Sequence, residues 1–234
     1  MHVPDGFLDV PTSVTTGVIA AAAIAVALKR SRAELAEDRA APMLGLVAAA
    51  VFASQMINFP VGDGTSGHLM GGALAAVLVG PATAVLCLTV VLIVQALVFA
   101  DGGITALGAN ITLMAIVTVL VGWAVFRGVM KLLPPHRTSM VAASAVGAFV
   151  SVPVAAGVFA LLFALGGQAP VSLGATMSAM LGWHALIGIG EAVITALLVS
   201  AVLISRPDLA YGAKYLPVSA PAHRVSAKPE KVLA

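Results

Sequence analysis

The sequence predicts an all-α membrane protein with about seven transmembrane helices. Of its 234 residues, 60% are hydrophobic and only 9% are charged, whereas a soluble domain carries about 25% charged residues. Apolar runs close to the length of a spanning helix recur along the chain. The lysines and arginines are confined to a few of the segments that separate or follow these runs. We therefore expect residues 1–205 to form a multi-pass domain in the cell membrane. Residues 206–234 are expected to form a polar, disordered cytoplasmic tail.

The expected helices follow from measuring each apolar run against the bilayer, which a helix of roughly 20 residues crosses. The runs cover residues 11–28, 42–59, 69–79, 82–100, 107–126, 140–165 and 177–205. Pro11 opens the first run, where its missing N–H costs nothing. Charged residues follow this run as far as Arg39, and the remaining runs are separated by turns rich in glycine and proline.

The third run is an exception, because its eleven residues rise by only about 16 Å. It is either a short helix buried by its neighbours or the first part of one kinked helix over residues 69–100. With seven runs and an external N-terminus, all 12 Lys and Arg residues lie on the inner side. A merged helix would instead place Arg127, Lys131 and Arg137 outside. The positive-inside rule therefore favours seven runs, with the N-terminus outside and the C-terminus inside.

The N-terminus begins with MHVPDG and lacks the basic region of a signal peptide. We expect no cleavage, and we expect Met1 to be retained because His2 is a large second residue. A free α-amine followed by His2 offers the amine, the His2 amide and a His2 ring nitrogen in fused planar chelate rings. Such planar nitrogen sets suit Ni(II) or Cu(II) and can hold Co(II). The alternative is a chance histidine in a flexible tail, against which Pro4-Asp5-Gly6 restricts the chain as a turn would.

The glycine-rich segment of residues 62–68 is the expected source of a fourth nitrogen. Its glycines, Gly67 among them, allow positive φ and close backbone approach, and His68 follows at the same outer face. The alternative for His68 is an ordinary interfacial loop histidine. No Lys-Ser/Thr pair follows the glycines, so the segment is not an ATPase phosphate loop. Energy for uphill transport would have to come from a partner or a gradient.

Further polar residues are expected to support this site. Gln95, Asp101 and Asn110 flank the turn at residues 101–103 and could hydrogen-bond the ligand segments, or simply cap helices. His184 and Glu191 are seven residues apart and share one face of the last helix. Ionisable residues inside a membrane are candidates for function, although a buried pair that stabilises the bundle is the alternative. Asp5 lies on the same outer side.

Several functions are disfavoured. No basic face is available for nucleic acid. The single Cys87 excludes a disulfide framework and a cysteine metal cluster. An intramembrane metalloenzyme using His184 and Glu191 lacks the H-E-x-x-H motif, and we expect no permanent cofactor. A gradient-driven carrier with Glu191 and His184 as a proton relay remains an alternative to a metal-capturing subunit.

Four segments together resemble the CbiM/NikM family: residues 1–8, 64–69, 101–110 and 184–192. The resemblance extends over residues 1–205 and implies the substrate-binding (S) component of an energy-coupling factor (ECF) importer for Co²⁺ or Ni²⁺. Such an importer would supply cobalamin synthesis or a nickel enzyme. The implied ligands are the Met1 amine, the His2 amide and ring, and the His68 ring. The implied fold is an S-component bundle with one additional N-terminal helix.

The same resemblance implies partner subunits. They are a transmembrane coupling (T) component, two cytoplasmic ATPases and often a small accessory membrane subunit, which some family members carry fused at the C-terminus. Residues 206–234 contain no apolar run, so a separate accessory chain is expected here. Pro4 and Asp5 do not separate cobalt from nickel.

Overall fold

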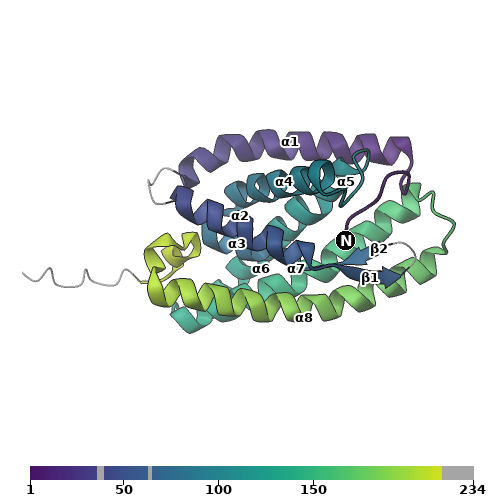
Figure 1. Cartoon of the computed structure of the whole chain (residues 1–234). Helices are drawn as coiled ribbons and strands as arrows, with labels where there is room; N and C mark the ends of the chain where they lie inside the picture. The colour runs from purple at the N-terminus through teal and green to yellow at the C-terminus, as the bar shows by residue number, and fades with distance from the viewer. Residues whose placement is uncertain (36–39, 63–64, 218–234) are drawn as a thin grey trace, which may run out of the picture.

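The computed structural model describes residues 1–35, 40–62 and 65–217. The helices run roughly along one long axis, with a small β-hairpin near one end (Figure 1). In chain order the elements are α1 (Val10–Glu34), α2 (Ala40–Met56), β1 (Phe59–Gly62), β2 (Thr65–Gly67), α3 (Gly72–Val79), α4 (Pro81–Val98), α5 (Leu107–Asn110), the π-helix η1 (Ile111–Val117), α6 (Thr118–Leu132), α7 (Arg137–Gly166), α8 (Leu173–Ser205) and the 3-10 helices η2 (Pro207–Leu209) and η3 (Tyr211–Tyr215).

The predicted class, an all-α membrane protein, is confirmed. Within the described residues, five helical segments are long and apolar enough to cross a membrane, namely α1, α4, the continuous segment Leu107–Leu132, α7 and α8. The apolar helix α2 is shorter. Large apolar side chains such as Val18 and Leu197 are exposed on these helices, as expected of surfaces that face lipid. The number of spans and the sides on which the termini lie stay predictions.

The third apolar run forms a helix of its own. All eight residues of α3 are buried, and the chain breaks at Gly80, whose φ is +93°, before Pro81 begins α4. A positive φ is strained for residues other than glycine, and proline cannot continue a helix. The short buried helix is therefore the correct alternative, and one kinked helix over residues 69–100 is not formed.

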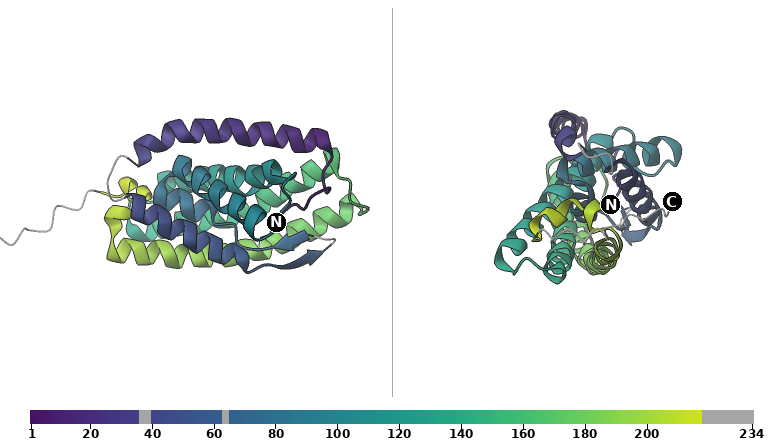
Figure 2. Two further views of the ribbon diagram at one scale, coloured as in Figure 1. Left: turned by 45° about the horizontal axis from the view of Figure 1, so that its top comes forward. Right: turned by 90° about the vertical axis from the view of Figure 1, so that its left-hand side faces the viewer.

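The two ends of the bundle differ in chemistry. At the N-terminal end, residues 1–9, the β-hairpin and the α7–α8 loop come together, and the first residue lies beside the hairpin in two views (Figures 1 and 2). At the opposite, basic end, the Glu34 carboxylate accepts hydrogen bonds from the Ala82 and Thr83 amides at 3.1 and 2.7 Å and so caps α4. The described Lys and Arg residues lie toward the ends of α1 and α6, at the first residue of α7 and after α8, which makes this end basic: Lys29, Arg30, Arg32, Arg127, Lys131, Arg137, Arg206 and Lys214.

The segment after α8 differs from the disordered tail expected from residue 206. It forms η2 and η3, and the rings of Tyr211 and Tyr215 pack within 5.7 and 5.9 Å of the Trp123 ring on α6. These two tyrosines give an otherwise polar segment enough aromatic surface to dock on the bundle. Residues 218–234, where the rest of the predicted tail falls, lie outside the described part of the chain.

The N-terminal segment is folded into the bundle instead of projecting from it. Met1 and Val3 are 1% and 0% exposed. The Asp9 amide donates to the Gly166 carbonyl at 2.7 Å, and the Gln168 amide donates to the Phe7 carbonyl at 3.0 Å. Asp9 then caps α1 by accepting a hydrogen bond from the Thr12 amide at 2.8 Å. These contacts fix where the chain's first residues lie.

Candidate metal centre

His2 and His68 meet inside the N-terminal end of the bundle. Their ring centroids are 4.5 Å apart, and the residues are 6% and 1% exposed. His2 belongs to the N-terminal segment, whose first three residues are buried. His68 follows Gly67, which pairs with Phe59 in the hairpin. The structure thus brings together the two histidines that the sequence analysis predicts as ligands, although it places His68 in the interior rather than at a surface.

The Gln95 contact favours one tautomer of the His2 ring. Its Nε2 lies 3.2 Å from Gln95 Oε1, and an amide oxygen can only accept a hydrogen bond, so a proton on Nε2 satisfies this contact. The other nitrogen, Nδ1, then has a free lone pair, and it has no hydrogen-bond partner among the described residues. Nδ1 is the ring nitrogen that can close a chelate ring with the amide of the same residue. Asp101 Oδ1, 3.2 Å away, adds negative charge beside it.

In His68 and His184 the two ring nitrogens have the opposite roles: Nδ1 faces a backbone oxygen, and Nε2 does not. Nδ1 of His68 lies 2.8 Å from the Leu69 carbonyl, and Nδ1 of His184 lies 2.7 Å from the Met180 carbonyl. A carbonyl fixes the proton on Nδ1, so each Nε2 is a bare lone pair. Both Nε2 atoms are buried without a partner in the described part of the chain. An unpaired buried polar atom is costly, which makes each of them a candidate to bind a ligand.

Met1, which carries the α-amine, is buried as well. Burial lowers the pKa of this amine from 8.0 to about 4, opposed in part by the Asp101 carboxylate. Burial also lowers the pKa of His2 from 6.5 to about 3, so both groups are uncharged at neutral pH. Neither the amine nor the His2 amide hydrogen-bonds to another residue that the structure describes. Two backbone nitrogens are therefore free beside the two rings.

Asn110 and Asp5 anchor this segment. The Val3 amide donates to Asn110 Oδ1 at 2.7 Å, and Asn110 Nδ2 donates back to the Val3 carbonyl at 3.1 Å. Asp5 Oδ1 accepts from the Thr105 amide at 2.7 Å and from its hydroxyl at 2.5 Å. A Cβ on Gly103 would lie 2.3 Å from the Asp5 amide nitrogen, so only glycine allows these two segments of the chain to pass so closely.

Two buried side chains hold the loop that carries His68. Glu191, 2% exposed on α8, accepts hydrogen bonds from the Met70 amide at 2.5 Å and the Gly71 amide at 2.7 Å. Gln55 Nε2 on α2 donates to the Met70 carbonyl at 2.8 Å. The sequence analysis singles out Glu191 but misses Gln55 and Thr105. A lone glutamine in an otherwise apolar helix is the signal that could have identified Gln55.

Side chains alone do not form an ordinary metal cluster here. No group of three or more His, Cys, Asp or Glu side chains with a geometry suited to a metal ion occurs in residues 1–35, 40–62 and 65–217. Any ion held between His2 and His68 would need the two backbone nitrogens as further ligands.

The fold is that of a transition-metal transport protein of the membrane. A crystal structure described as a transition metal transporter matches with a TM-score of 0.81 and 32% identity, over 92% of this chain and 97% of that one. A truncated transition metal transporter matches with a TM-score of 0.80 and 33% identity, over 87% and 99%. The family model CbiM, described as the cobalt uptake substrate-specific transmembrane region, matches residues 2–209. The chain belongs to this family of multi-pass membrane transport components, which are not enzymes.

Curated relatives carry related descriptions. A putative metal transport protein of Haloquadratum walsbyi is 40% identical over 90% of this chain and 94% of its own length. A putative fused nickel transport protein of Archaeoglobus fulgidus is 40% identical over 89% of this chain and 68% of its own length. The cobalt transport protein CbiM of Geobacter sulfurreducens is 37% identical over 56% of this chain and 39% of its own length. The relatives thus include proteins described for each of the two metals.

Proposed function

We propose that this chain captures Co²⁺ or Ni²⁺ through four nitrogens: the Met1 amine, the His2 amide, Nδ1 of His2 and Nε2 of His68. The proposal is carried by the His2 and His68 rings, whose centroids lie 4.5 Å apart and which each have a nitrogen without a partner among the described residues. The metal displaces the His2 amide proton, and the first three nitrogens then form fused chelate rings in one plane. His68 completes the square, a geometry that Ni²⁺ favours among divalent ions. Relatives described as nickel and cobalt transport proteins support this choice of ions.

The surrounding residues keep this nitrogen set in place. Gln95 favours one His2 tautomer, Asn110 holds Val3, and Glu191 holds the loop after His68. Such supporting hydrogen bonds orient metal ligands and raise their basicity. Asp101 provides a negative charge that partly offsets the charge of the ion.

We further propose that the chain acts as the S component of an ATP-driven ECF importer that supplies cobalamin synthesis or a nickel enzyme. A T component, two cytoplasmic ATPases and a small accessory membrane subunit would complete it. Only four residues of α1 are buried, so its lipid-facing side offers a surface for a membrane partner. Proteoliposomes that contain all subunits should take up Co²⁺ or Ni²⁺ only when ATP is present on the ATPase side. Uptake by this chain alone, driven by a proton gradient, would refute the ATP-driven assignment.

The carrier alternative makes Glu191 a proton relay, and Glu191→Gln distinguishes it from a loop anchor. The amide keeps one oxygen acceptor and loses the other, so the His68 loop should loosen and metal affinity should fall about tenfold. A relay would instead leave affinity unchanged and abolish uptake. Isothermal titration calorimetry measures the affinity. Glu34→Gln is the matched control, because Glu34 also accepts two backbone amides but at the basic end, and it should leave affinity unaltered.

Asn110→Ala should weaken metal binding by about 10–100-fold, the range typical of residues that position metal ligands. The substitution removes both hydrogen bonds to Val3 and frees the chelating segment to move. The same calorimetric titration tests it. Gln168→Ala serves as control, because this exposed side chain at the N-terminal end makes no contact with the histidines. Equal affinities in the two variants would show that Asn110 does not position the ligands.

A further inference from the structure

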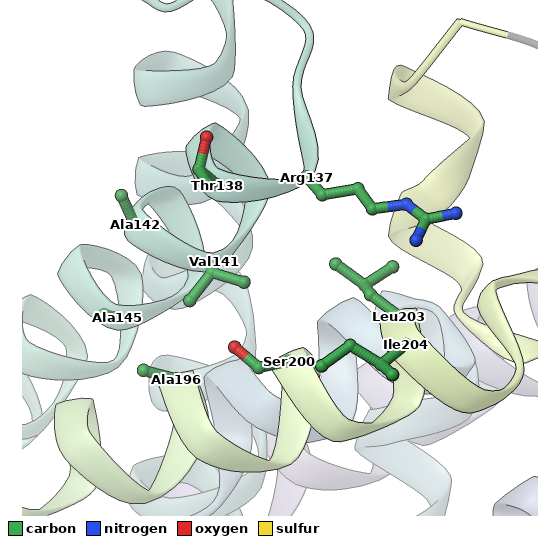
Figure 3. A pocket seen from close by; sticks show the side chains of 9 residues that line it. All are labelled: Arg137, Thr138, Val141, Ala142, Ala145, Ala196, Ser200, Leu203 and Ile204. Atoms are coloured by element: carbon green, nitrogen blue, oxygen red, sulfur yellow. The ribbon is translucent and has the colours of Figure 1, made fainter.

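A groove of about 440 Å³ lies between α7 and α8 at the basic end, far from the histidines (Figure 3). Most of its lining is aliphatic, and small side chains create the space: Ala142 and Ala145 on α7 face Ala196 on α8. The groove begins near the first turn of α7 and extends along both helices toward the middle of the bundle. Its long, apolar shape within membrane helices is suited to a hydrocarbon chain.

The mouth of the groove is positively charged. Arg137, the first residue of α7, extends its guanidinium across the mouth (Figure 3) and forms no hydrogen bond or ion pair with any residue that the structure describes. Arg206 nearby differs, because its guanidinium binds Asp208 through two hydrogen bonds of 3.0 and 2.9 Å. The N-terminus of α7 adds the positive end of its helix dipole. No carboxylate in the described part of the chain pairs with this charge, which is therefore available to an anion.

Ser200 places a hydroxyl along the groove. Several serines in the helices donate to a carbonyl of the preceding turn, as Ser54, Ser144 and Ser205 do at 2.7 Å each. Ser200, which lines the groove, has no such bond in the described part of the chain. A hydroxyl among apolar walls is stabilised only when it finds an acceptor.

We propose that this groove binds an anionic phospholipid. One acyl chain lies over the alanines, an ester oxygen accepts a hydrogen bond from Ser200, and the phosphate headgroup pairs with Arg137. Basic pockets between helices on the cytoplasmic side are suited to acidic headgroups, and the predicted topology places the basic end there. The proposal does not depend on the metal site, which lies at the opposite end.

Native mass spectrometry of the full-length protein in detergent tests this binding with two probes, phosphatidylglycerol and phosphatidylcholine. We expect phosphatidylglycerol to bind more tightly, and Arg137→Gln to reduce its affinity about fivefold while leaving phosphatidylcholine almost unaffected. Arg127→Gln, which changes an exposed arginine on α6, should have no such effect. Ala142→Leu should fill the groove and weaken both lipids, whereas Ala124→Leu on the exposed face of α6 should not.

Two outcomes would overturn the proposal. The first is equal affinity for the two lipids together with an unchanged value in Arg137→Gln. The second concerns a photo-crosslinking residue at position 142 in the complete transporter: crosslinks to another subunit, with none to lipid, would make the groove a protein interface. Crosslinks to lipid and a folded, metal-binding Arg137→Gln variant that loses only the phosphatidylglycerol preference would support it.

Discussion

Blocking the α-amine of Met1 should abolish metal binding. A cleavable tag placed ahead of Met1 converts the amine to an amide, whose nitrogen can bind a metal only after it loses a proton. The tag also has no space beside a residue that is 1% exposed. We expect the affinity for Ni²⁺ to fall by more than about 100-fold, beyond the range typical of residues that only position ligands. Calorimetry before and after proteolysis measures this, since a protease that leaves Met1 as the first residue should restore binding.

A tag at the C-terminus provides the control for this experiment. It leaves the Met1 amine unmodified, so it should leave metal affinity unchanged. Thermal unfolding in detergent shows whether the N-terminally tagged chain still folds. A folded, tagged protein that binds Ni²⁺ with native affinity would eliminate the amine as a ligand, and with it the chelate.

His2→Ala should be the most damaging single substitution. It removes the ring nitrogen of the chelate and the bond to Gln95, and it leaves only the amine and amide of the N-terminal set. Metal affinity should again fall by more than about 100-fold. His68→Ala should cost less, because the three-nitrogen chelate stays intact. Titration of both variants with Ni²⁺ and Co²⁺ measures the difference.

His136→Ala is the matched control for both histidine variants. His136 is exposed and precedes α7 at the basic end, so its loss should not alter the affinity for either ion. The order of effects is informative in itself. A larger loss in His68→Ala than in His2→Ala would mean that His68, and not the N-terminal chelate, dominates binding.

The membrane class and the short third helix could be predicted from the sequence because both follow from local composition. The shortage of charged residues indicates that lipid surrounds most of the chain. The preference of basic residues for the inner side predicts that α3 and α4 are separate helices, and they are divided at Gly80-Pro81. His2 and His68 could be proposed as a pair because a second-position histidine has a distinctive chelate chemistry. Only the structure shows that their ring centroids lie 4.5 Å apart.

Other features depend on tertiary contacts that the sequence does not encode locally. Gln55 looks like an isolated polar residue in α2 until its bond to the Met70 carbonyl is seen. The polar composition after residue 205 predicts disorder. Tyr211 and Tyr215 can pack against Trp123 only once α6 is folded. The free lone pairs of the histidines depend on which oxygen each ring faces. Ser200 and Arg137 become notable only because both line the groove and have no hydrogen-bond partner among the described residues.

X-ray absorption spectroscopy of the Ni²⁺-loaded protein tests the proposed four-nitrogen site, because it reports the atoms that surround the metal. We expect one shell of four nitrogens with two imidazole contributions and no sulfur, and a single imidazole contribution in His68→Ala. Six-fold coordination dominated by oxygen, or two imidazoles that persist in His68→Ala, would contradict it.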